Sequence, residues 1–330
     1  MTDSEQLIDV LDARVKRRED RRGFFRNALG AAAVTAAGAT ALTLGGRAQA
    51  QTTTFTDADV LNFALNLEYL EAQFYSYAAT GAGLASTLLG GSGQQGAVQG
   101  GRKVTFTDPA VAAYAREIAA DEVAHVSFLR AQLGASAVAQ PAIDVSVGPN
   151  SAFSVAARAA GVITAGQTFD PYATDENFLL GAFIFEDVGV SAYKGAAPLL
   201  TSKAYLEAAA GILAVEAYHA AIIRTTLTAK GLVTPSLWTA ADGISNARDT
   251  LDGPSEIDQG ITPTTRAVTS GTTTTTYAIS NIVPTDNSGI VFSRSPGQVL
   301  NIVYLTNTAA SLGGFFPAGV NGTIKTAAAA

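Results

Sequence analysis

The two histidines of this 330-residue sequence each follow a glutamate by three positions. The pairs are Glu122/His125 and Glu216/His219, and both lie in stretches with helical periodicity. Positions i and i+3 share one face of an α-helix, so each pair directs a carboxylate and an imidazole the same way. Two such pairs on two helices of one domain predict a site that holds a pair of metal ions.

Two further glutamates occur in matching positions of an internal repeat. Glu68 and Glu186 each interrupt an apolar helical face, and each is followed seven residues later by a tyrosine, Tyr75 or Tyr193. These tyrosines are either ordinary core residues or hydrogen-bond partners of the ligands. The order along the chain is therefore Glu, Glu-x-x-His, Glu, Glu-x-x-His, with both pairs on the apolar face of their helices.

A single Glu-x-x-His is common by chance, and a lone histidine on an apolar face is usually a satisfied core residue. The joint use of both histidines and two phased glutamates favours a metal site. Four buried carboxylates without cations would repel one another and lose hydration, and two divalent ions would neutralise them. Carboxylate and imidazole ligands suit iron or manganese.

Three other acidic residues lie close to the predicted ligands in the sequence and must be considered as alternatives. Glu71 lies one turn after Glu68 and could replace it, but Gly189 stands at the equivalent offset after Glu186, so the repeat favours Glu68. Glu71 is then expected beside the ligands. Asp121 and Asp187 are expected either beside the ligands or in solvent.

Four long helices are predicted to carry these side chains. Capping residues and glycine or proline breakers place them over 56–80, 107–133, 174–197 and 202–230. Segment 134–173 separates the two helix pairs, as in a bundle with one long crossover. A glycine-rich loop is expected over 81–101, and short helices over 151–160 and 237–251.

The first 50 residues are predicted to be a cleaved export signal. Arg21-Arg22 begins a segment that resembles a twin-arginine signal, an alanine-rich run follows, and Ala48-Gln49-Ala50 offers a cleavage site. A membrane anchor is less favoured, because the run is short and interrupted by glycine. The mature protein is therefore expected in the periplasm or outside the cell, with no membrane attachment after cleavage.

The rest of the chain divides by composition. Residues 51–252 hold the predicted bundle, and residues 253–330 form a threonine- and glycine-rich extension with short apolar runs. We expect this extension to be irregular or to form short strands, and to pack on the bundle. The net charge of −7 argues against a nucleic-acid partner, and the lack of cysteine excludes disulfides and thiolate ligands.

The ligand order resembles that of the ferritin-like superfamily of di-iron and di-manganese carboxylate proteins. Within it, the chain looks most like exported ferritin-like proteins related to plant desiccation-associated proteins, over residues 55–320. This likeness also rests on three segments, Asn66–Glu68, Phe292–Arg294 and Gly313–Pro317. The resemblance implies an all-α, ferritin-like four-helix bundle in which Glu122 and Glu216 bridge two ions.

The resemblance leaves three functions open. The first is an oxidoreductase of the ferroxidase, peroxidase or catalase kind, which reacts two iron or manganese ions with dioxygen or peroxide in oxidative or desiccation stress. The second is a protective or interaction protein with a structural or vestigial metal site. The third, iron storage, is less favoured because the long tail hinders packing into a shell. Oligomerisation is possible, and the sequence does not fix it.

Overall fold

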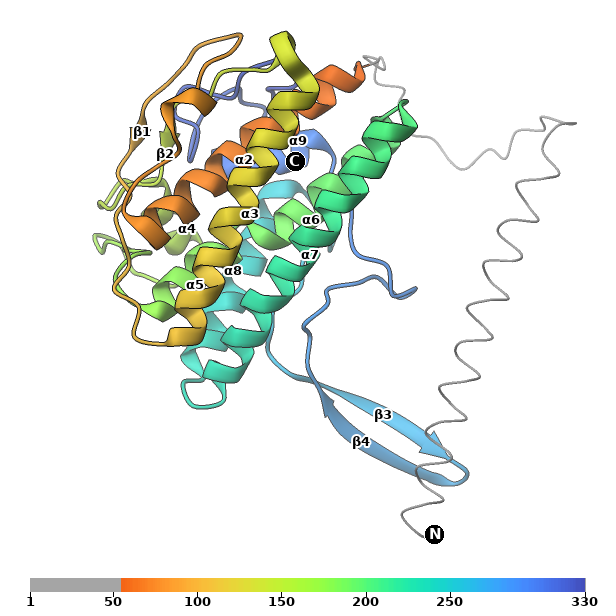
Figure 1. The fold of residues 1–330 in the computed structure, drawn as a ribbon. Coiled ribbons are helices and arrows are strands. Elements are labelled where there is room, and N and C mark those ends of the chain that lie inside the picture. Colours follow the sequence, from red (N-terminus) through yellow and green to blue (C-terminus); the bar gives the residue numbers. More distant parts are fainter. Residues whose placement is uncertain (1–54, 330) are drawn as a thin grey trace, which may run out of the picture. The chain divides into compact units, whose positions relative to one another are not determined.

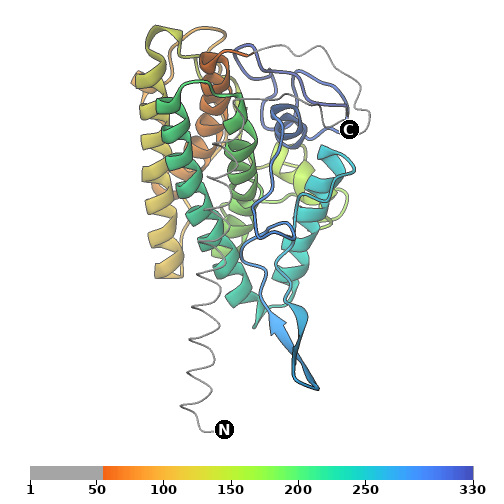
Figure 2. The ribbon, with the colours of Figure 1, turned by 90° about the vertical axis from the view of Figure 1, so that its right-hand side faces the viewer.

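The computed structural model describes residues 55–329, so the predicted export signal lies outside the described residues. The described chain is mostly helical, which confirms the predicted fold class. Its core is a four-helix bundle, in which α2 packs on α3 and α6 packs on α7 (Figures 1 and 2). These helices are α2 (Asp57–Thr80), α3 (Pro109–Leu133), α5 (Asp175–Phe183) continued by α6 (Glu186–Ala196), and α7 (Lys203–Gly231).

The predicted capping residues begin these helices. The Thr56 side chain accepts from the backbone N–H of Asp59, and the Asp59 carboxylate accepts from Thr56 in return. Asp108 caps α3 with Pro109 in its first turn. Helix α7 is apolar and long enough to cross a membrane by composition alone, but Glu216, His219 and Arg224 on it are buried within this protein.

The third predicted helix, 174–197, is interrupted in the structure. The backbone N–H groups of Ile184 and Phe185 bond to carbonyls three residues back, and regular helix resumes only at Glu186. The Phe183 carbonyl accepts a hydrogen bond from Arg248, a residue of α8. Local periodicity could not indicate this break, because the group that satisfies the freed carbonyl comes from a distant part of the chain.

Smaller elements surround the bundle. Three helices cover it, namely α4 (Ala152–Ala159), α8 (Ser236–Asp252) and α9 (Pro296–Tyr304). Single 3-10 turns occur at Ser86–Leu88, Gly134–Ser136 and Ala197–Leu199. Strand β1 (Val98–Gln99) pairs in parallel with β2 (Ile143–Asp144). Strands β3 (Thr264–Ser270) and β4 (Thr273–Ile279) form an antiparallel hairpin with Thr264 opposite Ile279, and all their residues are exposed.

The end of the chain packs on the bundle. Asn66 of α2 donates to the Asn321 carbonyl at 2.9 Å, and the Asn321 N–H donates back to Asn66 Oδ1 at 2.9 Å. The Phe315 ring meets the Phe153 and Phe185 rings at centroid distances of 5.1 and 4.9 Å. The apolar run 299–305, which the sequence analysis placed in the irregular extension, largely belongs to α9.

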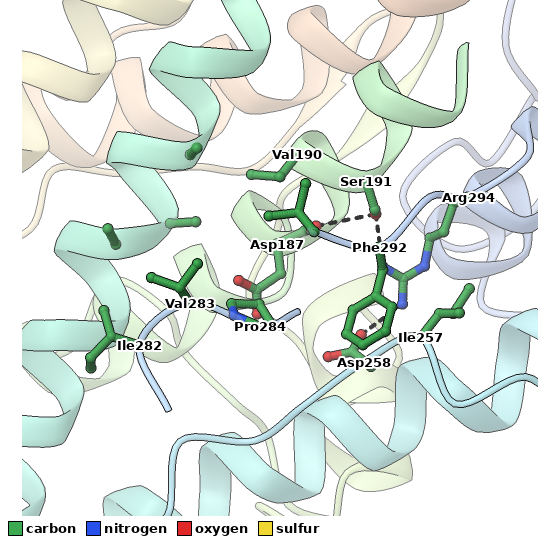
Figure 3. Close-up of a pocket in the computed structure, with 14 residues that line it drawn as sticks. Asp187, Val190, Ser191, Ile257, Asp258, Ile282, Val283, Pro284, Phe292 and Arg294 are labelled. Carbon is green, nitrogen blue, oxygen red and sulfur yellow. Dashed lines mark hydrogen bonds and ion pairs between the residues drawn. The ribbon is translucent and has the colours of Figure 1, made fainter. Parts of the chain in front are cut away.

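A buried network of ion pairs fastens this tail to the helices. Arg224 and Arg248 donate to Asp187 Oδ2 at 2.7 and 2.9 Å, and Arg248 also reaches Asp258 at 2.6 Å. Arg294 donates to Asp252 and Asp258 at 2.7 Å each. Figure 3 shows Asp187, Asp258 and Arg294 around the pocket between α6, α7 and the tail. Three positive and three negative charges balance, so the network can be buried.

We predict that Arg294→Ala destabilises the protein by about 3–5 kcal/mol, because it leaves the buried Asp252 carboxylate without its arginine and removes one of the two arginines that pair with Asp258. The matched control is Arg102→Ala, which breaks the half-exposed pair with Asp170 and should cost less than about 1 kcal/mol. Urea unfolding measures both free energies. Equal effects of the two substitutions would contradict the structural role given to the network.

Candidate metal centre

The six predicted ligands lie together in the core of the bundle. Each of these six residues is at most 8% exposed. Potential ligand atoms form two groups in which all atoms lie within 4.8 Å of one another. The first group contains Glu68, Glu122, His125 and Glu216, and the second contains Glu122, Glu186 and His219. Residues from four helical segments thus form two adjacent sites with one shared carboxylate.

Glu122 is the shared residue, and its two oxygens face different histidines. Its Oε2 lies 3.6 Å from Nδ1 of His125, and its Oε1 lies 3.2 Å from Nδ1 of His219. Glu122 would therefore be the ligand common to both ions if each group held one. Glu216 Oε1 lies 3.7 Å from His125 Nδ1, so Glu216 belongs to the first group in this geometry.

The outer two glutamates are held by tyrosines across the bundle. The Tyr75 hydroxyl donates to Glu186 Oε1, and the Tyr193 hydroxyl donates to Glu68 Oε1. Each tyrosine therefore donates its hydrogen bond to the glutamate in the other half of the repeat. Burial, together with the neighbouring carboxylates, raises the pKa of both phenols well above its usual range, so they remain protonated donors.

The inner face of the cluster is rich in acceptor atoms that no protein group satisfies. Six buried atoms of the cluster have no hydrogen-bond partner among residues 55–329: both oxygens of Glu122 and of Glu216, Glu186 Oε2 and His219 Nδ1. Unpaired buried polar atoms are rare because each carries a desolvation cost. Six at one place, all carboxylate oxygen or imidazole nitrogen, fit divalent cations as their partners.

Burial makes the cluster unfavourable without cations. Burial and the neighbouring glutamates raise the pKa of Glu122 and Glu216 well above the usual range. Burial, partly opposed by the Tyr75 hydrogen bond, raises the pKa of Glu186 to about 8. Burial by itself lowers the pKa of both histidines. The Glu68 carboxylate beside His125 and the Glu122 carboxylate beside His219 outweigh this effect, so the pKa of each histidine is raised. Protons therefore replace cations in the metal-free protein.

The environments of the two histidines differ. His219 Nε2 lies 3.1 Å from Asp121 Oδ2, and this contact leaves Nδ1 to face the cluster. A carboxylate behind a histidine commonly fixes the ring and tautomer of a metal ligand. The repeat places Val215 at the position equivalent to Asp121, so His125 has no such carboxylate from α7.

Glu71 is buried beside the cluster but lies outside both ligand groups. Its counterpart in the repeat, Gly189, is essential for space: a Cβ at Gly189 would lie 2.3 Å from Glu216 Oε2. The two halves of the bundle therefore carry the same ligand types, but one turn after the first glutamate of each half they differ, with Glu71 in one and Gly189 in the other. Asp187 faces away from the cluster into the arginine network, which the sequence analysis did not predict because ion-pair partners leave no local pattern.

We predict that the stability of the metal-free protein depends on pH more strongly than that of the metal-loaded protein. The raised carboxyl and histidine pKa values mean that the metal-free folded state binds more protons than the unfolded chain, so its stability falls as pH rises. Its Tm should drop by about 5 °C or more between about pH 5.5 and about pH 8. Deprotonation favours metal binding, so the loaded protein should not show this drop.

Calorimetry of chelated and loaded samples at both pH values measures this difference. Parallel pH profiles of the two samples would contradict the prediction.

Comparison with known proteins agrees with the geometry. The chain is 29% identical over 277 residues to "Ferritin-like catalase Nec2" from Nesocodon mauritianus, covering 81% of this chain and 84% of that protein. It is 31% identical over 253 residues to "Desiccation-related protein PCC13-62" from Craterostigma plantagineum, covering 74% and 76%. No solved structure matches. The family model for the ferritin-like domain matches residues 56–229, and the chain belongs to this family.

Proposed function

We propose that this protein is an exported oxidoreductase that binds two iron or manganese ions and disproportionates hydrogen peroxide. The observation that carries the proposal is the set of six buried ligand atoms without protein partners, shared between two adjacent groups. The similarity to a protein named as a ferritin-like catalase supports peroxide as the substrate. Disproportionation converts two molecules of hydrogen peroxide into two of water and one of dioxygen, so it needs no external reductant.

The metal ions would supply the reversible electron transfer that neither carboxylates nor imidazoles can perform. The chain's own residues supply position and exclusion of water. Glu122 directs one oxygen to each ligand group, while the tyrosine hydroxyls of Tyr75 and Tyr193 fix the outer glutamates. Asp121 orients His219 from the solvent side. Burial of the whole set keeps bulk water away from the reacting centre.

The cellular setting is part of the same proposal. A twin-arginine signal carries folded proteins, so the metal site could be filled before export to the periplasm or beyond. Similarity to a desiccation-related protein supports a role in stress, since drying and oxidative damage accompany one another. An exported peroxide-consuming enzyme would protect the cell envelope.

A second candidate function is non-catalytic protection with a structural metal site. It is favoured by the exposed threonine-rich hairpin β3–β4. A lone two-stranded hairpin is marginally stable in water, so such an arm is suited to contact with another surface. Peroxide turnover separates the two functions, because only the enzyme consumes the substrate.

We predict about two iron or manganese atoms per chain in protein purified from its native host, with rapid evolution of dioxygen from peroxide. Glu122→Ala and His219→Ala should each lower metal content and reduce turnover by at least about a hundredfold. Elemental analysis and an oxygen electrode provide the measurements, with Glu117→Ala on the exposed face of α3 as the control. A loaded protein without peroxide turnover would favour the protective function instead.

A further inference from the structure

A small apolar chamber lies directly behind the ligand cluster, between α2, α6 and α9. Its volume is about 20 Å³. Nine of its twelve lining residues are apolar, among them Ala192 of α6 and Val299, Ile302 and Val303 of α9. The remaining three are Glu71, Gly189 and Tyr193. Only one of the twelve carries a charge-bearing group, so the composition favours a small neutral occupant.

The chamber adjoins the ligands at two points. Gly189 separates it from Glu216, because an added Cβ there would lie 2.3 Å from Glu216 Oε2. Tyr193 lines the chamber and donates its hydroxyl to Glu68. A molecule in the chamber therefore lies beside two ligands of the first group, Glu68 and Glu216.

Glu71 supplies the polar group of the chamber. Its residue is 6% exposed, and its carboxylate makes no hydrogen bond to any residue of the described chain. A buried carboxylate without a partner is costly unless a bound molecule donates to it. The other half of the repeat has no such carboxylate, because Gly189 occupies the equivalent position on α6. The extra carboxylate is present in one half of the repeat only, beside the chamber.

The C-terminal extension closes the chamber. Val299, Ile302 and Val303 of α9 form one wall, and α9 lies outside the matched region 56–229. Asn301 anchors the helix by donating to the carbonyls of Thr306 and Ala328 at 2.8 and 2.9 Å. Just before α9, Arg294 joins the buried ion network. The tail is thus held firmly at the place where it walls the chamber.

We propose that this chamber binds one molecule of hydrogen peroxide, which donates an O–H hydrogen bond to the Glu71 carboxylate. This rests on the proposed function and adds its substrate site. A water-sized site needs about 10–15 Å³, so the chamber admits a molecule of two heavy atoms and excludes alkyl peroxides. Dioxygen has no proton to donate and would leave Glu71 unpaired. The extension therefore selects the substrate by size.

The first test alters the size of the chamber in the metal-loaded full-length protein. Ala192→Val fills it and should slow hydrogen peroxide consumption about tenfold, because the two added methyl groups occupy the space. Val303→Ala enlarges it and should raise the rate with tert-butyl hydroperoxide relative to hydrogen peroxide about tenfold. The control is Ala247→Val, which lines a neighbouring cavity between α4, α8 and α9 but does not line the chamber, and it should change neither rate.

The second test separates the chamber from the reaction. Nitric oxide is a neutral diatomic probe of ferrous protein, and its association is followed by stopped-flow absorbance without turnover. Ala192→Val should slow this association about tenfold. Glu71→Leu should weaken peroxide use and leave nitric oxide association unchanged, while Glu71→Gln, which keeps an acceptor oxygen, should restore peroxide use. Metal content is measured for every variant.

Two results would overturn the proposal in different ways. Normal peroxide turnover with no effect of Ala192→Val, Val303→Ala or Glu71→Leu places the substrate elsewhere and leaves the proposed function intact. Absence of turnover in the loaded wild-type protein overturns the proposed function, and unchanged nitric oxide association in Ala192→Val then also removes the chamber as a route to the centre.

Discussion

Repulsion among buried carboxylates is the constraint on which the rest of this structure depends. Glu68, Glu122, Glu186 and Glu216 lie within one cluster at the centre of the bundle, each at most 1% exposed. Such a cluster is strongly unfavourable unless cations or protons neutralise it. The surrounding helices must therefore be held in place by other interactions, and these are found in the tyrosine hydrogen bonds, the apolar core and the arginine network.

The arrangement separates charge into two neutral regions. One region is the ligand cluster, whose negative charge two divalent ions would balance. The other is the network of three arginines and three aspartates, which balances itself. Neighbouring residues of α6 serve different regions: Glu186 faces the cluster, and Asp187 faces the network. Helix α6 begins afresh at Glu186, after an interruption that Arg248 of the same network supports.

The sequence predicts the bundle and the ligand cluster because both rest on local periodicity. The i, i+3 spacing and the apolar stripes place Glu122/His125 and Glu216/His219 on inner faces, and the structure brings them together with Glu68 and Glu186. The interrupted third helix, the ion network and helix α9 depend on partners far along the chain. No local pattern encodes such pairs, so the sequence analysis missed them. The export signal remains a prediction, because it lies outside the described residues.

The central claim is that the six buried ligands hold two metal ions. X-ray diffraction from crystals of natively purified protein, collected at the iron and manganese absorption edges, tests this most directly. The account predicts two anomalous peaks, one on each side of Glu122, with the two histidine Nδ1 atoms directed at different ions. The account would be contradicted if protein purified without any chelator showed an ordered ligand cluster but no anomalous peaks.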